Sequence, residues 1–169
     1  KVGSREELLE QMQGGLPEKF FVTEFVETRN GSEFYRKLRA SVVADDIVIV
    51  RVDFHEDWKV HGGRSGRRVA FYLDHPELLA EERRICANPE QELGNKAVQA
   101  LRAMRARIPL DVFGVDFQVD AEGDVVFFEA NATMNLLTNS HDSVANPREA
   151  HDRLLDAFRR YFSSLVARH

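Results

Sequence analysis

The chain has 169 residues, of which 43% are hydrophobic, so its length and composition fit one domain with a substantial apolar core. Its net charge is −5, which excludes a global basic field and argues against nucleic acid as a partner. Cys86 is the only cysteine, which excludes an intrachain disulfide and a cysteine-based zinc site. No segment approaches the roughly 18 apolar residues of a membrane helix, and no signal peptide is visible, so we expect a cytoplasmic protein without a membrane partner.

The first third of the sequence predicts one helix, one strand and one hairpin. Ser4-Arg5-Glu6-Glu7 matches a capping box, so a helix should begin after Ser4 and end at Gly14-Gly15. The apolar run 20–26 predicts a strand, and Asn30-Gly31 predicts a turn. The runs 34–43 and 47–54 predict a hairpin that turns at residues 44–46.

The rest of the chain predicts helices around a second hairpin. Residues 62–68 are rich in glycine and arginine and predict a flexible basic loop. Pro76 is suited to the first position of a helix, Asn88-Pro89 ends that helix, and apolar periodicity predicts a second helix from about Pro89 to Arg107. A final amphipathic helix is predicted to begin near Pro147. This order of elements favours an α+β fold, with an antiparallel sheet packed against helices.

The second hairpin carries a candidate metal site. The strand around Asp116 and the strand that ends in Glu129-Ala130-Asn131 are joined by the turn sequence at 120–124. Antiparallel pairing would bring Asp116 beside Glu129 and Asn131, and the latter two share a face because strands alternate with a period of two. Carboxylate and amide oxygens without cysteine or histidine suit Mg²⁺. The alternative is a hairpin whose acidic side chains are merely solvated.

These residues resemble the signature of the ATP-grasp superfamily, the ATP-dependent carboxylate–amine ligases and their relatives. In that family an aspartate and the glutamate of a Glu-x-Asn motif bind one Mg²⁺, and the glutamate and asparagine bind a second. The resemblance therefore implies that Asp116, Glu129 and Asn131 bind two magnesium ions with ATP, and that Mn²⁺ could replace them.

Two upstream segments extend the resemblance. Glu24-Phe25-Val26 resembles the family's linker, whose backbone binds adenine, and Glu27 would hold the ribose. Arg36 and Arg51, on the two strands of the first hairpin, would face the cleft and stabilise the phosphates or the reaction intermediate. The alternatives are an ordinary half-buried strand and a pair of solvated cations.

The sequence also departs from the family pattern. Gly114 stands where relatives often have an arginine, and no Pro-Gly turn follows Asn131. The family's phosphate-binding lysine and glycine-rich loop have no counterpart, and the chain begins with Lys1, so we expect residues 1–169 to form a single, partial ATP-grasp domain that binds ATP weakly without the N-terminal part of the protein.

The resemblance implies an ATP- and Mg-dependent ligase that activates a small carboxylate substrate as an acylphosphate, which an amine or another nucleophile then attacks. An ATP-grasp kinase and a non-catalytic nucleotide-binding or structural module are the alternatives.

Overall fold

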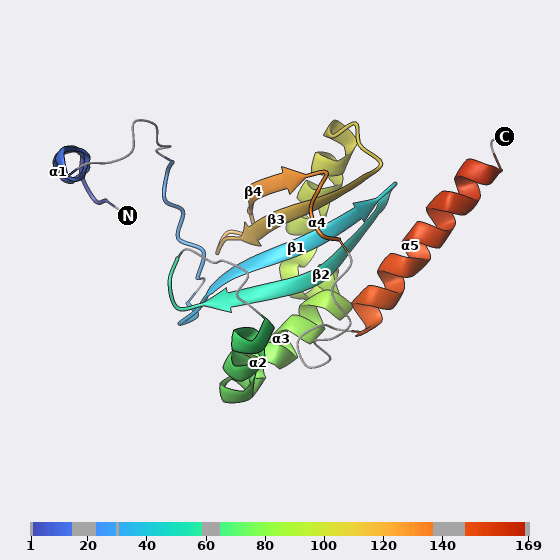
Figure 1. Ribbon diagram of the computed structural model, residues 1–169, viewed down its shortest axis with the longest axis horizontal. Helices are drawn as coiled ribbons and strands as arrows, with labels where there is room; N and C mark the ends of the chain where they lie inside the picture. The colour runs from blue at the N-terminus through green and yellow to red at the C-terminus, as the bar shows by residue number, and fades with distance from the viewer. Residues whose placement is uncertain (1, 15–22, 30, 59–64, 137–147, 168–169) are drawn as a thin grey trace.

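The computed structural model describes residues 2–14, 23–29, 31–58, 65–136 and 148–167 of the chain. Its centre is a four-stranded antiparallel sheet with the strand order β2-β1-β3-β4 (Figure 1). The α+β class and the antiparallel sheet packed against helices are therefore confirmed. The strands are β1 (Tyr35–Val43), β2 (Asp46–His55), β3 (Val112–Val119) and β4 (Val125–Asn131).

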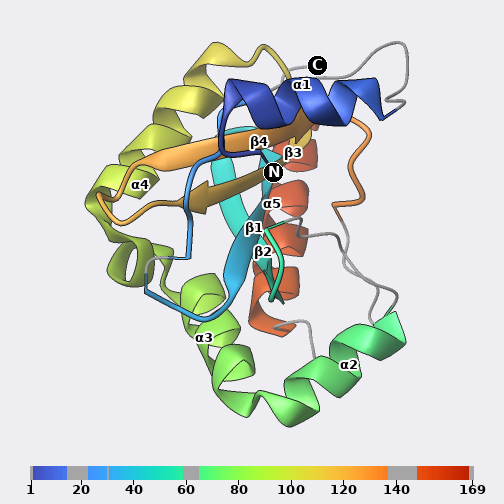
Figure 2. The same cartoon turned by 90° about the vertical axis from the view of Figure 1, so that its left-hand side faces the viewer.

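Five helices belong to the described part of the chain, and two of them cover one face of the sheet. Figure 2 shows α3 and α4 along this face. Leu38 and Phe117 of the sheet are buried there against Ile85 of α3 and Leu101 of α4. The helices are α1 (Arg5–Gln13), α2 (Ser65–Asp74), α3 (Pro76–Ala87), α4 (Pro89–Arg107) and α5 (Arg148–Val166).

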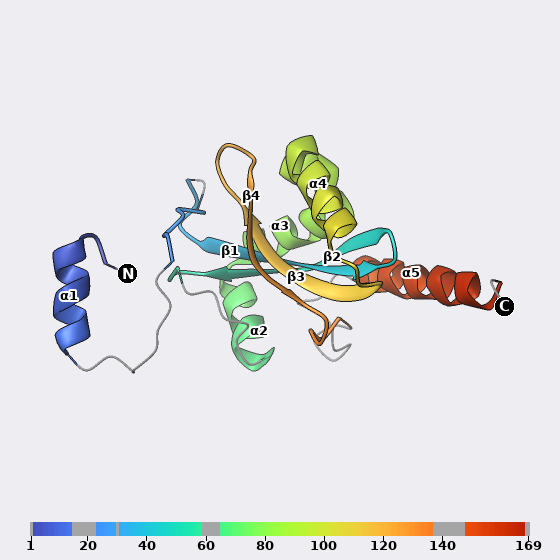
Figure 3. The same ribbon diagram turned by 90° about the horizontal axis from the view of Figure 1, so that it is seen from above.

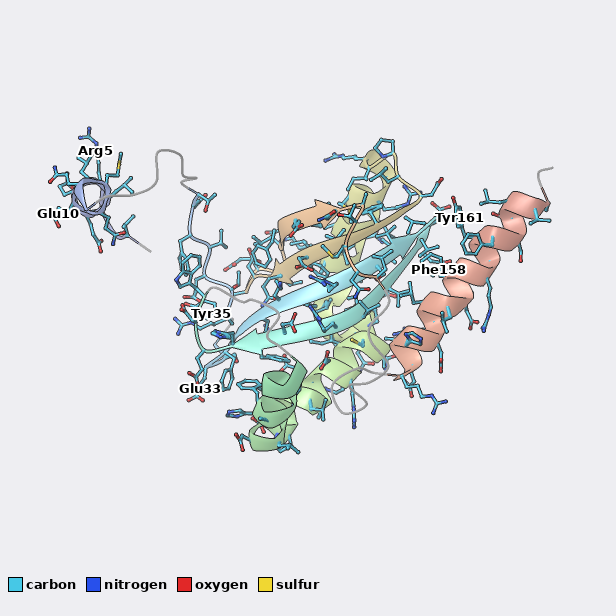
Figure 4. The ribbon with its side chains drawn as sticks, viewed as in Figure 1. Arg5, Glu10, Glu33, Tyr35, Phe158 and Tyr161 are labelled. Carbon is cyan, nitrogen blue, oxygen red and sulfur yellow. The ribbon has the colours of Figure 1, made fainter. Side chains whose placement is uncertain are left out.

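Among the described residues, a helix covers the opposite face only near the turn between β1 and β2. There Val43 and Val50 are buried together with Leu154 of α5, and Phe158 and Tyr161 pack against this cluster (Figure 4). Figure 3 shows α5 extending past the end of the sheet. The remainder of this face carries the polar side chains from which the candidate site is built.

The strand β2 pairs with β1 on one side, and on its outer edge it is bonded at Val52 to helical side chains. The Tyr72 hydroxyl of α2 donates to the carbonyl of Val52 at 2.9 Å, and the amide of Val52 donates to Glu82 Oε1 of α3 at 3.0 Å. Both Val52 backbone groups are thereby satisfied by α2 and α3. Helical side chains that take up the edge groups of a strand in this way block pairing with another chain at that point.

Most of the predicted elements are confirmed. Ser4 caps α1 by accepting from the amide of Glu7 at 3.1 Å, and Glu7 reaches back to the amide of Gly3. Both hairpins and the helix Pro89–Arg107 occupy the predicted residues, and α3 begins at Pro76. Gly94, with φ of 83°, introduces a kink in α4 that the apolar periodicity does not reveal. The described part of the chain contains no helix long and apolar enough to cross a membrane.

Two predictions are wrong where the structure describes them. Residues 23–26 of the predicted strand 20–26 are not in a strand, because an apolar run forms one only where another strand is available to pair with it. Residues 20–22 lie outside the described part. Residues 65–68 of the predicted loop 62–68 begin α2, and 62–64 lie outside the described part. Tyr72 is buried in the core and Phe71 packs against it, so tertiary contacts stabilise α2.

Candidate functional site

Four charged residues lie side by side across the polar face of the sheet, one on each strand. Arg51 of β2 pairs with Arg39 of β1, Arg39 pairs with Asp116 of β3, and Asp116 pairs with Glu129 of β4. Directly opposed residues of antiparallel strands point to the same face, so these four form what we call the cross-strand row. The row brings Asp116 and Glu129 together as the sequence predicts, and Asn131 shares their face.

Irregularities in two strand pairs create this row. Between β3 and β4 the register shifts beside Asp116, and between β1 and β2 it shifts beside Arg39. Phe117 pairs with Phe127, so a regular ladder would place Phe128, and not Glu129, opposite Asp116. Because a slip of one residue moves a side chain to the other face, the bulge at Phe128 keeps the Glu129 carboxylate out of the apolar core.

The row opposes like charges in two places, which is unfavourable for a sheet. Arg51 lies opposite Arg39, and Asp116 lies opposite Glu129. Like charges directly opposite each other destabilise strand pairing. Stability alone does not favour this arrangement, and bulges are frequent beside active sites as well as on edge strands such as β2 and β4.

Asp116 is the most heavily contacted carboxylate of the row. Its two oxygens accept from Arg39 at 2.7 and 2.9 Å, and Lys37 Nζ lies 3.0 Å from Oδ2. Burial by itself would raise the pKa of Asp116, but the hydrogen bonds from Arg39 and Lys37 outweigh it and hold this pKa below its ordinary value. The contact with Asp116 likewise raises the pKa of Arg39. Asp116 is therefore an ionised carboxylate at neutral pH.

Glu129 and Asn131 are joined to each other rather than to the cations. The Asn131 side-chain amide donates to Glu129 Oε1 at 2.9 Å. Its carbonyl oxygen accepts from both the amide and the hydroxyl of Thr133, each at 2.8 Å. Glu129 is exposed, whereas Asp116 is 3% exposed, so the row runs from a buried carboxylate to a solvent-accessible one.

The segment after Asn131 closes one end of the polar face. Met134 lies directly on Gly114, which pairs with Asn131: a Cβ at Gly114 would come within 2.4 Å of Met134 Sδ. The carbonyl of Leu136 then accepts from Ser41 of β1 at 3.4 Å. The chain thus crosses from β4 over β3 to β1, and Met134 occupies the space above Gly114, where the family resemblance would place an arginine.

The predicted adenine-binding residues lie at the other end of this face. The Gln118 side chain of β3 donates to the carbonyl of Thr28 at 2.8 Å, which ties residues 23–29 to the sheet. Glu27 is bonded to Arg29 and lies 3.5 Å from the hydroxyl of Tyr35, which Figure 4 shows at the start of β1. Glu24 and Val26 are exposed. The rings of Phe25 and Trp58 meet edge to face, with 6.4 Å between their centroids.

The two predicted arginines do not come together. Arg51 belongs to the cross-strand row and lies 3.1 Å from Asp53 Oδ2. Arg36 is on the opposite face, where its guanidinium donates to Glu81 of α3 at 2.8 Å and lines a cavity of about 220 Å³. The prediction that both arginines face one cleft is wrong, because Arg36 alternates in phase with the buried residue Leu38.

Lys37 and Arg39 are the site residues that the sequence analysis did not assign. The same alternation contained the signal: Leu38, Ala40 and Val42 form the apolar face of β1, so Lys37 and Arg39 must face away from the core. Side-chain exposures of 14% and 18% place both cations partly out of water beside Asp116, where electrostatic contacts are stronger than at an open surface.

The oxygens of Asp116, Glu129 and Asn131 match Mg²⁺ in kind and lie on one face. Arg39, Lys37 and Thr133 donate to them, so a metal would have to replace some of these contacts. Within the described part of the chain, no three residues drawn from histidine, cysteine, aspartate and glutamate are placed to hold a metal. A magnesium ion bound here would need to obtain its remaining ligands from phosphates and water.

Comparison with known proteins does not assign a family. No family model matches the chain, and no curated protein or solved structure matches it. The proposals below therefore depend on the geometry of the site and on the sequence resemblance.

Proposed function

We propose that the polar face binds ATP with Mg²⁺, and that the chain is the magnesium-binding C-terminal part of an ATP-dependent ligase of the ATP-grasp type. The observation that carries this proposal is the pairing of Asp116 with Glu129, with Asn131 two residues further along the same strand. With Phe128 present, the bulge sets this pairing, although the pairing opposes two negative charges.

Cations and anions have separate roles in this proposal. Asp116, Glu129 and Asn131 hold one or two magnesium ions, and Mn²⁺ could take their place. When bound, the metal offsets the negative charge that develops during phosphoryl transfer. Arg51 binds the phosphates or stabilises the intermediate, and guanidinium groups are suited to this because they contact phosphate through two parallel hydrogen bonds.

The remaining parts of the proposal follow from the resemblance. The backbone of residues 24–26 binds adenine, Glu27 binds the ribose, and the N-terminal part of the protein supplies the lysine and the glycine-rich loop. The substrate carboxylate attacks the γ-phosphorus of ATP and ADP leaves; an amine or another nucleophile then attacks the acylphosphate carbon and phosphate leaves. A cytoplasmic location, where ATP is abundant, belongs to the same proposal. Arg36 has no part in it, because it faces α3.

The test uses the protein in its natural length with ATP, Mg²⁺ and a panel of small carboxylic acids and amines. A ligase releases ADP and phosphate in equal amounts and yields a condensed product. A kinase of the same fold instead accumulates a stable phosphorylated product. Glu129→Gln should abolish ADP release, whereas the control Glu122→Gln, on the exposed β3–β4 turn, should leave it unchanged.

One observation favours the non-catalytic alternative. Around the row, three cations (Lys37, Arg39 and Arg51) face three carboxylates (Asp53, Asp116 and Glu129), so these six side chains together carry no net charge without any ligand. Such a face could serve structure alone. Nucleotide binding or turnover that is the same in Glu129→Gln and in the unaltered protein would support this alternative and overturn the ligase proposal.

A further inference from the structure

We propose that Lys37 and Arg39 are exchangeable counter-ions: they neutralise Asp116 when the site is empty, and they move to the ligand's phosphates when a divalent cation takes Asp116. This inference rests on the proposed function and adds two residues to it. It implies that the site admits metal and phosphate together much more readily than metal alone.

The contacts of Asp116 motivate the exchange. Three nitrogen–oxygen contacts of 2.7 to 3.0 Å surround this carboxylate, two from Arg39 and one from Lys37. An ionised carboxylate offers about four lone-pair positions, so few remain for a metal while both cations are in place. A divalent cation that uses more than the one remaining position must therefore displace at least one of these contacts, and in every case it meets the repulsion of two nearby positive charges.

Both cations can leave Asp116 without leaving the polar face. Arg39 and Lys37 are on β1, at the centre of the face, and their side chains are 18% and 14% exposed, so they are neither buried in the core nor free in solvent. Long, flexible side chains of this kind can turn toward a phosphate above the sheet while their backbones stay in the ladder.

The charge balance favours a joint exchange. The three cations and three carboxylates around the row cancel, so a lone divalent cation would leave the face with excess positive charge. Phosphate groups that arrive with the metal provide new anionic partners for the displaced Lys37 and Arg39. Because uncompensated charge at a partly buried site is costly, the two ligands should bind cooperatively.

The experiment measures Mn²⁺ binding to this chain by electron paramagnetic resonance, with and without inorganic tripolyphosphate. The test variant is Lys37→Met, which removes one cation but leaves the paired hydrogen bonds of Arg39. Lys37→Arg keeps the charge. Lys96→Met is the control for the loss of a surface lysine, because Lys96 forms an exposed ion pair, at 2.8 Å with Asp124, away from the row.

We expect Lys37→Met to bind Mn²⁺ about tenfold more tightly than the unaltered chain when phosphate is absent, because one charge-assisted contact no longer competes. We expect the same variant to lose roughly tenfold in its affinity for tripolyphosphate in the presence of Mn²⁺. Lys37→Arg and Lys96→Met should match the unaltered chain in both measurements. A variant that merely loosens the fold would weaken both affinities together, which would overturn the inference.

Failure of the inference and failure of the proposed function give different results. If Asp116→Asn lowers Mn²⁺ affinity but Lys37→Met does not raise it, the exchange is overturned and the metal site stands. If neither variant changes Mn²⁺ affinity, the metal site is overturned as well.

A second measurement uses the unaltered chain and does not depend on the folding of a variant. The side-chain Nε–H resonance of Arg39 should shift when Mg²⁺ and tripolyphosphate are added together, and much less with Mg²⁺ alone. An unchanged Arg39 resonance under saturating ligand would contradict the exchange.

Discussion

Gly114 offers the sharpest test of how the polar face is closed. A Cβ at this position would lie 2.4 Å from Met134 Sδ, 2.9 Å from its Cγ and 2.8 Å from its Cβ. Carbon and sulfur atoms do not approach so closely, and the short distance to the Met134 Cβ means that a change of rotamer cannot relieve the clash. Gly114→Ala must therefore displace residues 132–136 or distort β3.

Two effects of opposite sign determine the stability of Gly114→Ala. Replacement of glycine by alanine restricts the unfolded chain and stabilises a protein by about 0.4–1 kcal/mol where the native conformation accepts it. Overpacking at a tight contact costs roughly 1–3 kcal/mol. The contact distances place Gly114 in the second regime, so we expect a net loss of about 1–2 kcal/mol, equivalent to roughly 2–8 °C in Tm for a chain of this length.

The assay is urea unfolding of four variants: Gly114→Ala, Gly3→Ala, Met134→Ala and the double variant Gly114→Ala with Met134→Ala. Gly114→Ala should be destabilised, and Gly3→Ala, where the nearest atom to the new Cβ is 3.5 Å away, should not. In the double variant Gly114→Ala with Met134→Ala, the two changes should couple favourably, since the second removes the obstacle to the first. A Gly114→Ala protein as stable as the unaltered chain would refute the close packing of Met134 on β3.

Three further predictions follow from the sheet. Asp116→Asn should be less stable than the unaltered chain at neutral pH. The lowered pKa of Asp116 stabilises the folded protein at every pH above 3.8, the ordinary pKa of this carboxyl group. The difference in free energy of unfolding, measured with urea, should therefore shrink as the pH falls below 3.8. Tyr72→Phe, which removes the buried bond to the carbonyl of Val52, should lose about 1 kcal/mol. Tyr161→Phe, which removes a solvent-exposed bond to Asp111 and keeps the half-buried ring, should lose less than about 0.5 kcal/mol in the same assay. Deletion of Phe128 removes the extra residue of the bulge, so that a regular ladder places Glu129 opposite Asp116. Cross-strand nuclear Overhauser contacts between these two residues should therefore persist, and their disappearance would mean that the bulge does more than set the register.

Local patterns in the sequence determined most of the elements. The capping box at Ser4, Pro76 and Pro89 at helix starts, and the turn residues 120–124 each act through contacts within a few residues, so they predict boundaries without knowledge of the fold. The amphipathic periodicity of α4 and α5 is equally local. These signals establish the α+β class and the second hairpin, on which the candidate site depends.

The sequence also contained the information that Arg39, and not Arg36, faces the candidate site, although the family resemblance had indicated Arg36. Strict alternation along β1 places Arg36 with the buried Leu38 and places Arg39 on the other face. Applied before the resemblance, this rule assigns Arg39 to the site and Arg36 to the helix side. Alternation is reliable here because the apolar face of β1 is fully buried.

Only the tertiary structure decided the register of the row and the closure of the face. A bulge depends on the balance between ladder hydrogen bonds and the cost of burying the Glu129 carboxylate, and no local pattern around Phe128 encodes that balance. The contact between Met134 and Gly114 joins residues of two different segments, and the pairing of Arg39 with Asp116 spans 77 positions. Residue types and strand periods are local properties, whereas the partner that a side chain meets across the sheet is set by how the whole chain packs.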